Sequence, residues 1–151
     1  MPHLIAKPVS IPVPGGKSIE EFVGLPSTGD TGVSVAVMVA PAGWDEPFQT
    51  PTFDEFTVVL EGELLVDHGD ETSAVVAGQA IITRAGERIR YRTDSGARYV
   101  AVCLPAFAPE QAHRDESSSR SRRATRVECS TETPPLPSMA CTTEARPAGA
   151  T

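Results

Sequence analysis

A chain of 151 residues is long enough for one domain with a sizeable core, since 40% of its residues are hydrophobic although only 5% are aromatic. The formal net charge of −7 argues against a nucleic-acid groove or an anionic membrane surface as the main partner. The three cysteines are too few and too scattered for a disulfide framework or a zinc motif, and no stretch is apolar enough for a signal peptide or a membrane span. These properties favour a cytoplasmic protein with no nucleic-acid or membrane partner.

Residues 1–32 are rich in proline and glycine and are expected to form an N-terminal extended arm and a loop. Three prolines alternate with β-branched residues between positions 8 and 14, which predicts an edge segment without regular ladder hydrogen bonds. Residues 18–23 are predicted to form one helical turn capped by Ser18, because their acidic residues fall in the first turn. Lys17 precedes this turn and is given no role.

Short strands are predicted between positions 33 and 104, where runs of β-branched and apolar residues are separated by turn residues. They cover residues 33–40, 56–60, 63–67, 72–76, 79–83, 88–93 and 98–104. A tight turn is predicted at Glu61-Gly62 and a hairpin at residues 68–70. Even spacing without a helical period indicates an all-β sandwich or barrel. A helical turn or two, opened by Pro109, is predicted over residues 109–116.

The composition changes at Arg114, and residues 114–151 are predicted to be a disordered tail. This stretch has no aromatic residue and few aliphatic ones, so it cannot bury enough apolar area to offset the entropy of ordering. Six arginines and five acidic residues give it a charge of +1, so the part before it carries −8. The arginines of residues 120–126 are expected to be solvated, with contact to an anionic partner as the alternative.

Two glycine-containing motifs carry a family resemblance. Glu55 is followed after six residues by Gly62, which matches the first conserved motif of the cupin superfamily. Residues 78–89, GQAIITRAGERI, match the second motif. Over residues 33 to about 106 the chain therefore resembles the cupins. The resemblance implies a small double-stranded β-helix, an RmlC-like jelly-roll barrel, which we place over residues 33–113.

Cupins usually hold a metal with two histidines and a glutamate from the first motif and a histidine from the second. In this chain the three histidine positions fall on Gln49, Pro51 and Ile89, and only Glu55 keeps the usual residue. A carboxylate with an amide does not make a tight site for a first-row metal, so the resemblance implies neither a metal nor another cofactor. An irregular site built from Glu55, Gln49 and a histidine from elsewhere stays open as an alternative.

Among cupins without the usual ligands, the chain resembles the ethanolamine-utilisation protein Q group. The shared features are the aromatic-Asp-Glu and Val-Leu-Glu-Gly-Glu-Leu pattern of residues 53–64, and Ile89, Tyr91 and Thr93 in the second motif. That group is linked to acetate kinase activity. This chain shows no glycine-rich phosphate cradle with a lysine, so the activity is not transferred to it.

The period of two in a strand sorts the side chains near the first motif. If Glu55 points into the barrel, Thr57 does too, while Phe56, Val58 and Leu60 point outward. This apolar outer face has to be covered by a second sheet or by a partner subunit. Because cupins commonly dimerise through such surfaces, a homodimer is expected.

The same alternation turns Ile89, Tyr91 and Thr93 inward and the neighbouring arginines outward, as a solvated or interface stripe, with a substrate clamp as the alternative. A carboxyl group in an apolar wall has its pKa raised by desolvation, which suits Glu55 as a catalytic acid or base with Tyr91 as its catalytic partner. The alternative is a satisfied polar cluster left from an ancestral metal site.

The remaining candidate residues are expected to bind the substrate because they face inward or surround the barrel mouth; they are Gln49, Phe53, Thr57, Ile89, Thr93 and Trp44. The predicted function is to bind a small organic molecule in the barrel as a metal-independent isomerase, lyase or cyclase. Two alternatives stay open. One is a non-catalytic binding or accessory cupin, and the other is a metal-dependent oxygenase or isomerase with an irregular site.

Overall fold

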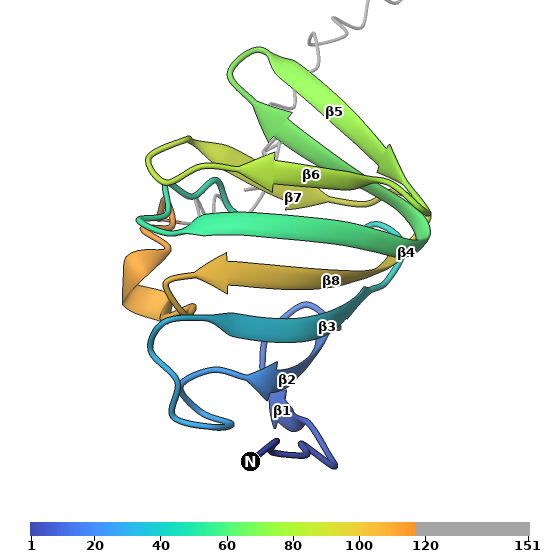
Figure 1. The fold of residues 1–151 in the computed structure, drawn as a ribbon. Helices are drawn as coiled ribbons and strands as arrows, with labels where there is room; N and C mark the ends of the chain where they lie inside the picture. Colours follow the sequence, from blue (N-terminus) through green and yellow to red (C-terminus); the bar gives the residue numbers. More distant parts are fainter. Residues whose placement is uncertain (117–151) are drawn as a thin grey trace, which may run out of the picture. The chain divides into compact units, whose positions relative to one another are not determined.

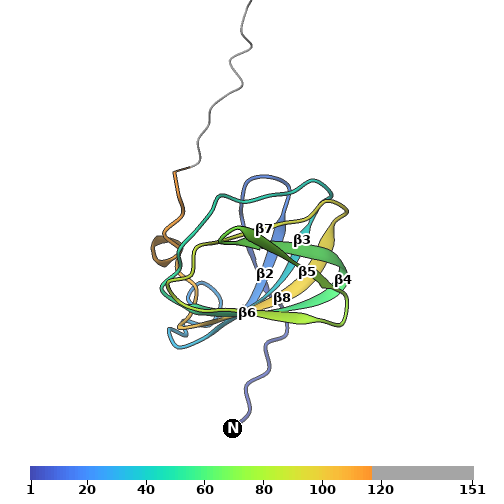
Figure 2. The same cartoon turned by 90° about the horizontal axis from the view of Figure 1, so that it is seen from above.

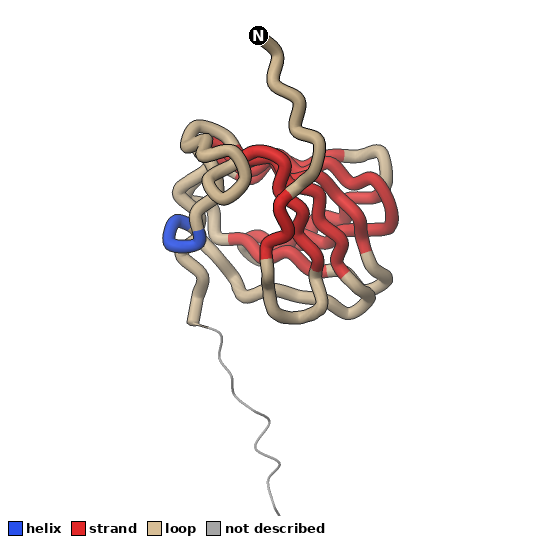
Figure 3. The backbone as a smooth tube through the Cα atoms, turned by 90° about the horizontal axis from the view of Figure 1, so that it is seen from below, coloured by secondary structure: helices blue, strands red, loops and turns tan. Residues whose placement is uncertain are grey.

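Regular alternation of buried and exposed side chains produces an almost purely β structure. The computed structural model describes residues 1–116. The strands are β1 (Val9–Ile11), β2 (Ser18–Val23), β3 (Ser34–Ala40), β4 (Asp54–His68), β5 (Glu71–Val76), β6 (Ala80–Thr83), β7 (Ile89–Arg92) and β8 (Ala97–Leu104). A 3-10 turn, η1 (Pro109–Gln111), lies beside the end of β8 (Figures 1 and 3).

Strand β4 connects the two sheets of the barrel. Residues 54–62 pair with β8 on one side and, in part, with β6 on the other. Residues 63–68 pair with β5 and β7. All pairings are antiparallel, and the larger sheet continues from β8 through β3 and β2 to β1. The strands curve around a common interior (Figure 2), so the predicted all-β jelly-roll barrel is confirmed.

The N-terminal region differs from the sequence-based expectation. The helical turn over residues 18–23 is wrong, because these residues form β2 and pair with β3. The segment before it is also in regular register, with Val9–Ile11 paired to β2. Glu20 is exposed and Glu21 is 4% exposed, which is the alternation of a strand. Pairing with a neighbouring strand thus outweighs the local helix-start signal.

Most strands between positions 33 and 104 lie where the sequence places them, but the turn at Glu61-Gly62 is wrong. Strand β4 runs through it with a bulge between Val59 and Glu61. Gly62 has a φ of 74°, and a Cβ there would collide with the carbonyl oxygen of Gly96. Glycine is therefore required for close approach of two backbones. The hairpin at residues 68–70 is confirmed, since β4 turns into β5 there.

Two of the predicted outward arginines tie β7 to its neighbouring strand β4 within the smaller sheet. Asp67 on β4 accepts hydrogen bonds from Arg90 Nη2 at 2.7 Å and Arg92 Nε at 3.0 Å. Burial alone raises the pKa of Asp67, but hydrogen bonds from Arg92, Thr72 and Arg90 outweigh it and hold the pKa well below its usual range. The arginine stripe is thus anchored to β4.

The outer face of the larger sheet is apolar and lacks cover from the part of the chain that the structure describes. Its exposed large side chains come from four strands: Val39 is 44% exposed, Val58 41%, Leu60 41%, Ile82 51% and Leu104 45%. The second sheet covers the inner face and leaves this one open. Of the two expected covers, the second sheet does not lie over this face among residues 1–116. The predicted tail begins too early, because Arg114 forms a bridge with Gln49 and the N–H of Asp115 donates to the carbonyl oxygen of Phe48 at 2.7 Å. Residues 117–151 of that tail lie outside the described residues, and with them the arginines of residues 120–126, Cys129 and Cys141.

We expect Gly62→Ala to lower the free energy of unfolding by roughly 3 kcal/mol or more, because left-handed strain of about 1–2 kcal/mol adds to the backbone collision. Urea denaturation measures this difference. Gly78→Ala is the matched control, since Gly78 has a φ of 86° but open space around its Cβ. Equal losses for the two variants would contradict the close-approach argument.

Candidate active site

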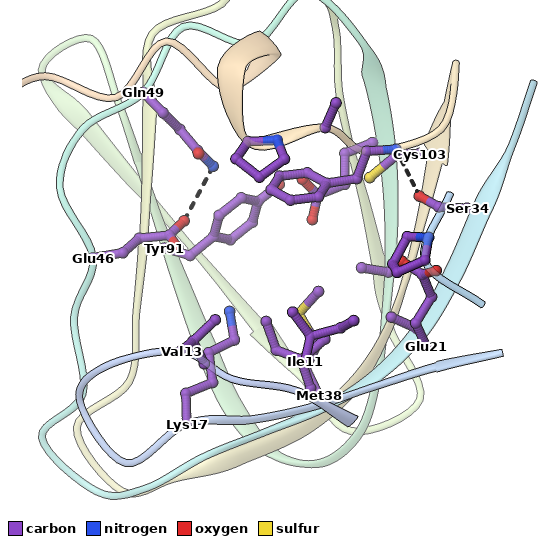
Figure 4. Close-up of a pocket in the computed structure, with 18 of the residues that line it drawn as sticks. Ile11, Val13, Lys17, Glu21, Ser34, Met38, Glu46, Gln49, Tyr91 and Cys103 are labelled. Atoms are coloured by element: carbon purple, nitrogen blue, oxygen red, sulfur yellow. Dashed lines mark hydrogen bonds between the residues drawn. The ribbon is translucent and has the colours of Figure 1, made fainter. Parts of the chain in front are cut away.

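The barrel contains a cavity of about 530 Å³. Its wall is largely apolar, with Ile11, Val13 and Met38 on one side and Tyr91 on the other (Figure 4). Charged and amide side chains also line it, and they come from separate segments of the chain: Lys17, Glu21, Glu46, Gln49, Glu55 and Arg114. A mixed wall of this kind is typical of a small-molecule site.

Glu55 is a carboxyl group with little compensation for its burial. It lies on β4 between β6 and β8, and it is 8% exposed. Within residues 1–116, its one side-chain hydrogen bond comes from Thr57 Oγ1 at 3.2 Å. Burial and, after it, the charge of Glu46 raise the pKa of Glu55 to about 7, against the opposing charge of Lys17. At neutral pH both protonation states are therefore populated.

Gln49 brings an unpaired acceptor to the same cavity. Its backbone exchanges hydrogen bonds with Ile89 at 2.8 and 2.9 Å, which fixes it beside β7. The side chain is 4% exposed, and its Nε2 donates to Glu46 Oε1 at 3.1 Å. The other amide atom, Oε1, is buried with no hydrogen-bond partner among the described residues. An unpaired buried acceptor costs about 1–3 kcal/mol, so a donor on a bound molecule would be favoured there.

Tyr91 forms part of the cavity wall from β7 and is 3% exposed. Its hydroxyl lies 3.0 Å from Thr83 Oγ1, so the group already has a partner within the protein. Burial raises the pKa of Tyr91 well above its ordinary value, and the charge of Glu55 adds to this effect. The phenol therefore stays protonated at neutral pH.

Sequence reasoning missed Lys17, which lies in the turn between β1 and β2. Its side chain points into the cavity (Figure 4). The ammonium group lies 4.2 Å from the ring centroid of Trp44 and 5.4 Å from that of Tyr99. Burial lowers the pKa of Lys17, an effect that the charges of Glu46 and Glu55 oppose. The sequence signal was weak, since Lys17 flanks a segment that reads as a helix start.

Glu46 was also missed, because it lies in the irregular segment between β3 and β4. It lines the cavity and accepts the hydrogen bond from Gln49. Burial raises the pKa of Glu46, while the charges of Lys17 and Arg114 lower it. Glu46 lies in a proline-flanked connection. Such a connection has no strand period, so the sequence does not predict where the side chain of Glu46 points.

The other predicted binding residues lie behind the cavity wall. Phe53 packs edge-on against Phe107, with ring centroids 5.6 Å apart. Ile89 belongs to the hydrophobic core. Thr93 Oγ1 donates to the carbonyl oxygen of Glu63 at 2.7 Å and accepts from the backbone N–H of Gly96 at 3.0 Å, so it holds a turn.

Two more of these residues act on the cavity through a neighbour. Thr57 is fully buried and donates to Glu55, so it supports the carboxyl group from behind. Trp44 presents its ring to Lys17. Asp54, the other acid of the first motif, points away and binds Arg84 at 2.8 Å and the backbone N–H of Ala85 at 2.9 Å.

The residues present do not fit the usual cupin metal. Of the four ligand positions, Gln49 and Glu55 line the cavity, whereas Pro51 and Ile89 have no donor atom in their side chains. Within residues 1–116, no three side chains of His, Cys, Asp or Glu are grouped so that they could hold a metal ion. His68 is engaged with Ser73 Oγ at 2.8 Å. We therefore derive no chemical step through a metal.

Comparison with known proteins agrees with this architecture. Residues 35–104 match the family model described as the cupin domain. The barrel is a cupin domain. No helix among residues 1–116 has the length and apolar character that crossing a membrane requires.

Two relatives of this chain carry different names. Over 112 residues, 73% of this chain, the sequence is 44% identical to endoribonuclease YbeY of Myxococcus xanthus, of which the match covers 38%. Over 81 residues, 52% of this chain, it is 36% identical to acetate kinase EutQ of Escherichia coli, of which the match covers 34%. The cupin chain thus spans little more than a third of either relative.

A solved structure supports the predicted subgroup. The crystal structure of a putative ethanolamine utilisation protein Q from Salmonella typhimurium superposes with a TM-score of 0.53 at 27% identity, covering 60% of this chain and 71% of that one. The resemblance to the protein Q group is therefore confirmed.

The raised pKa of Glu55 predicts how stability changes with pH. Between the ordinary value of 4.5 and about 7, the unfolded chain loses this proton while the folded protein keeps it. The contribution of Glu55 to stability is therefore fully present below pH 4.5, falls as the pH rises to about 7, and is constant above that. The loss amounts to about 3 kcal/mol. We expect Glu55→Gln to remove it, so that the variant gains stability relative to the wild type across this range.

Urea unfolding at a series of pH values checks this prediction. Glu20→Gln is the matched control, because Glu20 is exposed on β2. Parallel stability curves for the wild type and Glu55→Gln would show that the carboxyl group is not desolvated.

Proposed function

We propose that the barrel binds a small organic molecule and moves a proton within it without a metal, as an isomerase, lyase or cyclase. One observation carries this proposal: Glu55 faces a largely apolar cavity with a pKa near 7 and a single hydrogen-bond partner. A carboxyl group with this pKa is matched to proton transfer at neutral pH, because it can both accept and return a proton.

The surrounding residues fit the same role. Gln49 Oε1 is free to accept a hydrogen bond from the substrate and would orient it. Tyr91 and Tyr99 supply apolar walls that keep water away from the reacting atoms. Glu55 is in none of the ion pairs among residues 1–116, so its carboxyl group is not neutralised by a fixed cation.

A second candidate is a non-catalytic small-molecule binding or accessory cupin. The hydrogen bond between Tyr91 and Thr83 favours it, because the predicted catalytic partner of Glu55 is already engaged. The activities after which the relatives are named belong to proteins of which this chain matches little more than a third, and they do not decide between the two candidates.

We expect Glu55→Gln to keep ligand binding and to lower turnover by about a hundredfold or more, since general acid–base groups contribute about 10²–10⁴-fold. A thermal-shift screen of small metabolites identifies binders, and NMR of each mixture detects product. Glu20→Gln serves again as the control. Wild-type turnover in Glu55→Gln would refute proton transfer by this residue, and binding without product in the wild type would select the second candidate.

We also propose that a second copy of the chain covers the apolar outer face. The register places Val37, Val58 and Val100 in one row across three adjacent strands, so two such faces can pack on each other. We expect the wild type to be a dimer and Val58→Glu a folded monomer by light scattering. Val76→Glu is the control, because Val76 is also 41% exposed but lies on β5 in the other sheet. A monomeric wild type would contradict the proposal.

A further inference from the structure

The ammonium group of Lys17 has no polar partner within the described part of the chain. No hydrogen bond or ion pair among residues 1–116 includes it, and its close neighbours are the rings of Trp44 and Tyr99. An ammonium group has three N–H donors, and a partly desolvated charge is costly unless those donors are satisfied. The aromatic faces stabilise the charge but offer no hydrogen-bond acceptor. The cavity therefore contains an unused set of donors.

Gln49 brings an acceptor that lacks a hydrogen-bond donor to the same cavity. Its Oε1 is a buried acceptor without a donor, and its Nε2 is held by Glu46 in an orientation that keeps Oε1 unpaired. A molecule that satisfies both groups has to bring an acceptor to Lys17 and a donor to Gln49.

We propose that the cavity takes a small monocarboxylate that also carries a hydroxyl group, with the carboxylate bound by Lys17 and the hydroxyl donating to Gln49 Oε1. The hydrocarbon part of the molecule lies against the apolar wall of Ile11, Val13 and Met38. This assignment deepens the function proposed above by naming the substrate class, and it rests on the same cavity.

The charges along the wall favour a single negative charge on the ligand. Lys17 and Arg114 both line the cavity, so a cationic ligand would meet two cations. A dianion would meet three acidic side chains of the wall, Glu21, Glu46 and Glu55, against the same two cations. A monoanion is compatible with Glu46 and Glu55, because Glu55 has a pKa of about 7 and can hold its proton when the carboxylate arrives.

Anchoring at Lys17 also leaves the proposed reaction intact. The carboxylate is held by the lysine, so Glu55 needs to make no contact with it and is free to exchange a proton elsewhere on the molecule. Lys17 is thus a binding and positioning residue in this scheme, and Glu55 is the proton-transfer residue.

Matched analogues test the two contacts separately on the full chain. The probes are 2-, 3- and 4-hydroxybutyrate and mandelate, each beside its amide and its deoxy acid, which are butyrate and phenylacetate. We expect at least one hydroxy acid to raise the melting temperature at millimolar concentration. Its amide should bind at least tenfold more weakly because the charge on Lys17 is unused, and its deoxy acid more weakly because Gln49 stays unpaired. Calorimetric titration gives the ratios.

Two substitutions assign these preferences to residues. Lys17→Met should abolish the preference for acid over amide and leave amide binding unchanged, while Lys17→Arg retains the preference and guards against misfolding. Lys7→Met is the control, since Lys7 is exposed before β1. Gln49→Met should abolish only the preference for the hydroxyl group.

Three outcomes would each overturn the assignment. The wild type could bind acid and amide equally, Lys17→Met could keep the preference for the acid, or no hydroxy acid could raise the melting temperature. Because these are binding measurements, they are independent of turnover. A loss of turnover in Glu55→Gln with the acid preference absent would leave proton transfer standing and remove only the substrate class.

Discussion

The structure depends on one strand that belongs to two sheets. Strand β4 pairs with β8 and β6 over its first part and with β5 and β7 over its second. It can pass from one sheet to the other because Gly62 allows the backbone to approach Gly96 closely. Glu55 in the first part is thereby fixed between β6 and β8, and it lines the same cavity as Tyr91 of β7.

Two carboxyl groups on β4 show how strongly the surroundings of a side chain determine its pKa and its role. Asp67 receives hydrogen bonds from Arg90 and Arg92, so its charge is fully compensated and its pKa falls. Glu55 receives one hydrogen bond, from a threonine, and its pKa rises. The two acids on this strand thus have different roles. Asp67 stabilises the fold, whereas Glu55 retains an exchangeable proton where a ligand can reach it.

The barrel strands could be predicted because each has a local period of two and a turn signal at its ends. Glu55, Gln49 and Tyr91 could be placed on the cavity because they lie in or beside the two cupin motifs. Lys17 and Glu46 could not, since both lie in connections without a strand period, and Lys17 is placed by its contact with Trp44, which is far from it in the sequence. The misread β2 has the same cause, because its pairing with β3 is invisible to a local pattern. The sequence therefore predicted the cavity residues that lie in or beside the two motifs, and it did not predict those in the connections.

The short edge formed by β1 and β2 both closes the cavity and carries its ammonium group. Strand β1 has three residues and pairs only with β2, and the turn that follows it contains Gly15 and Gly16 at positive φ before Lys17. Any outward displacement of this edge opens a path into the barrel and at the same time withdraws a positive charge from Glu55. Ligand entry and the acidity of the central carboxyl group are therefore coupled, because the charge of Lys17 lowers the pKa of Glu55 and moves with this edge.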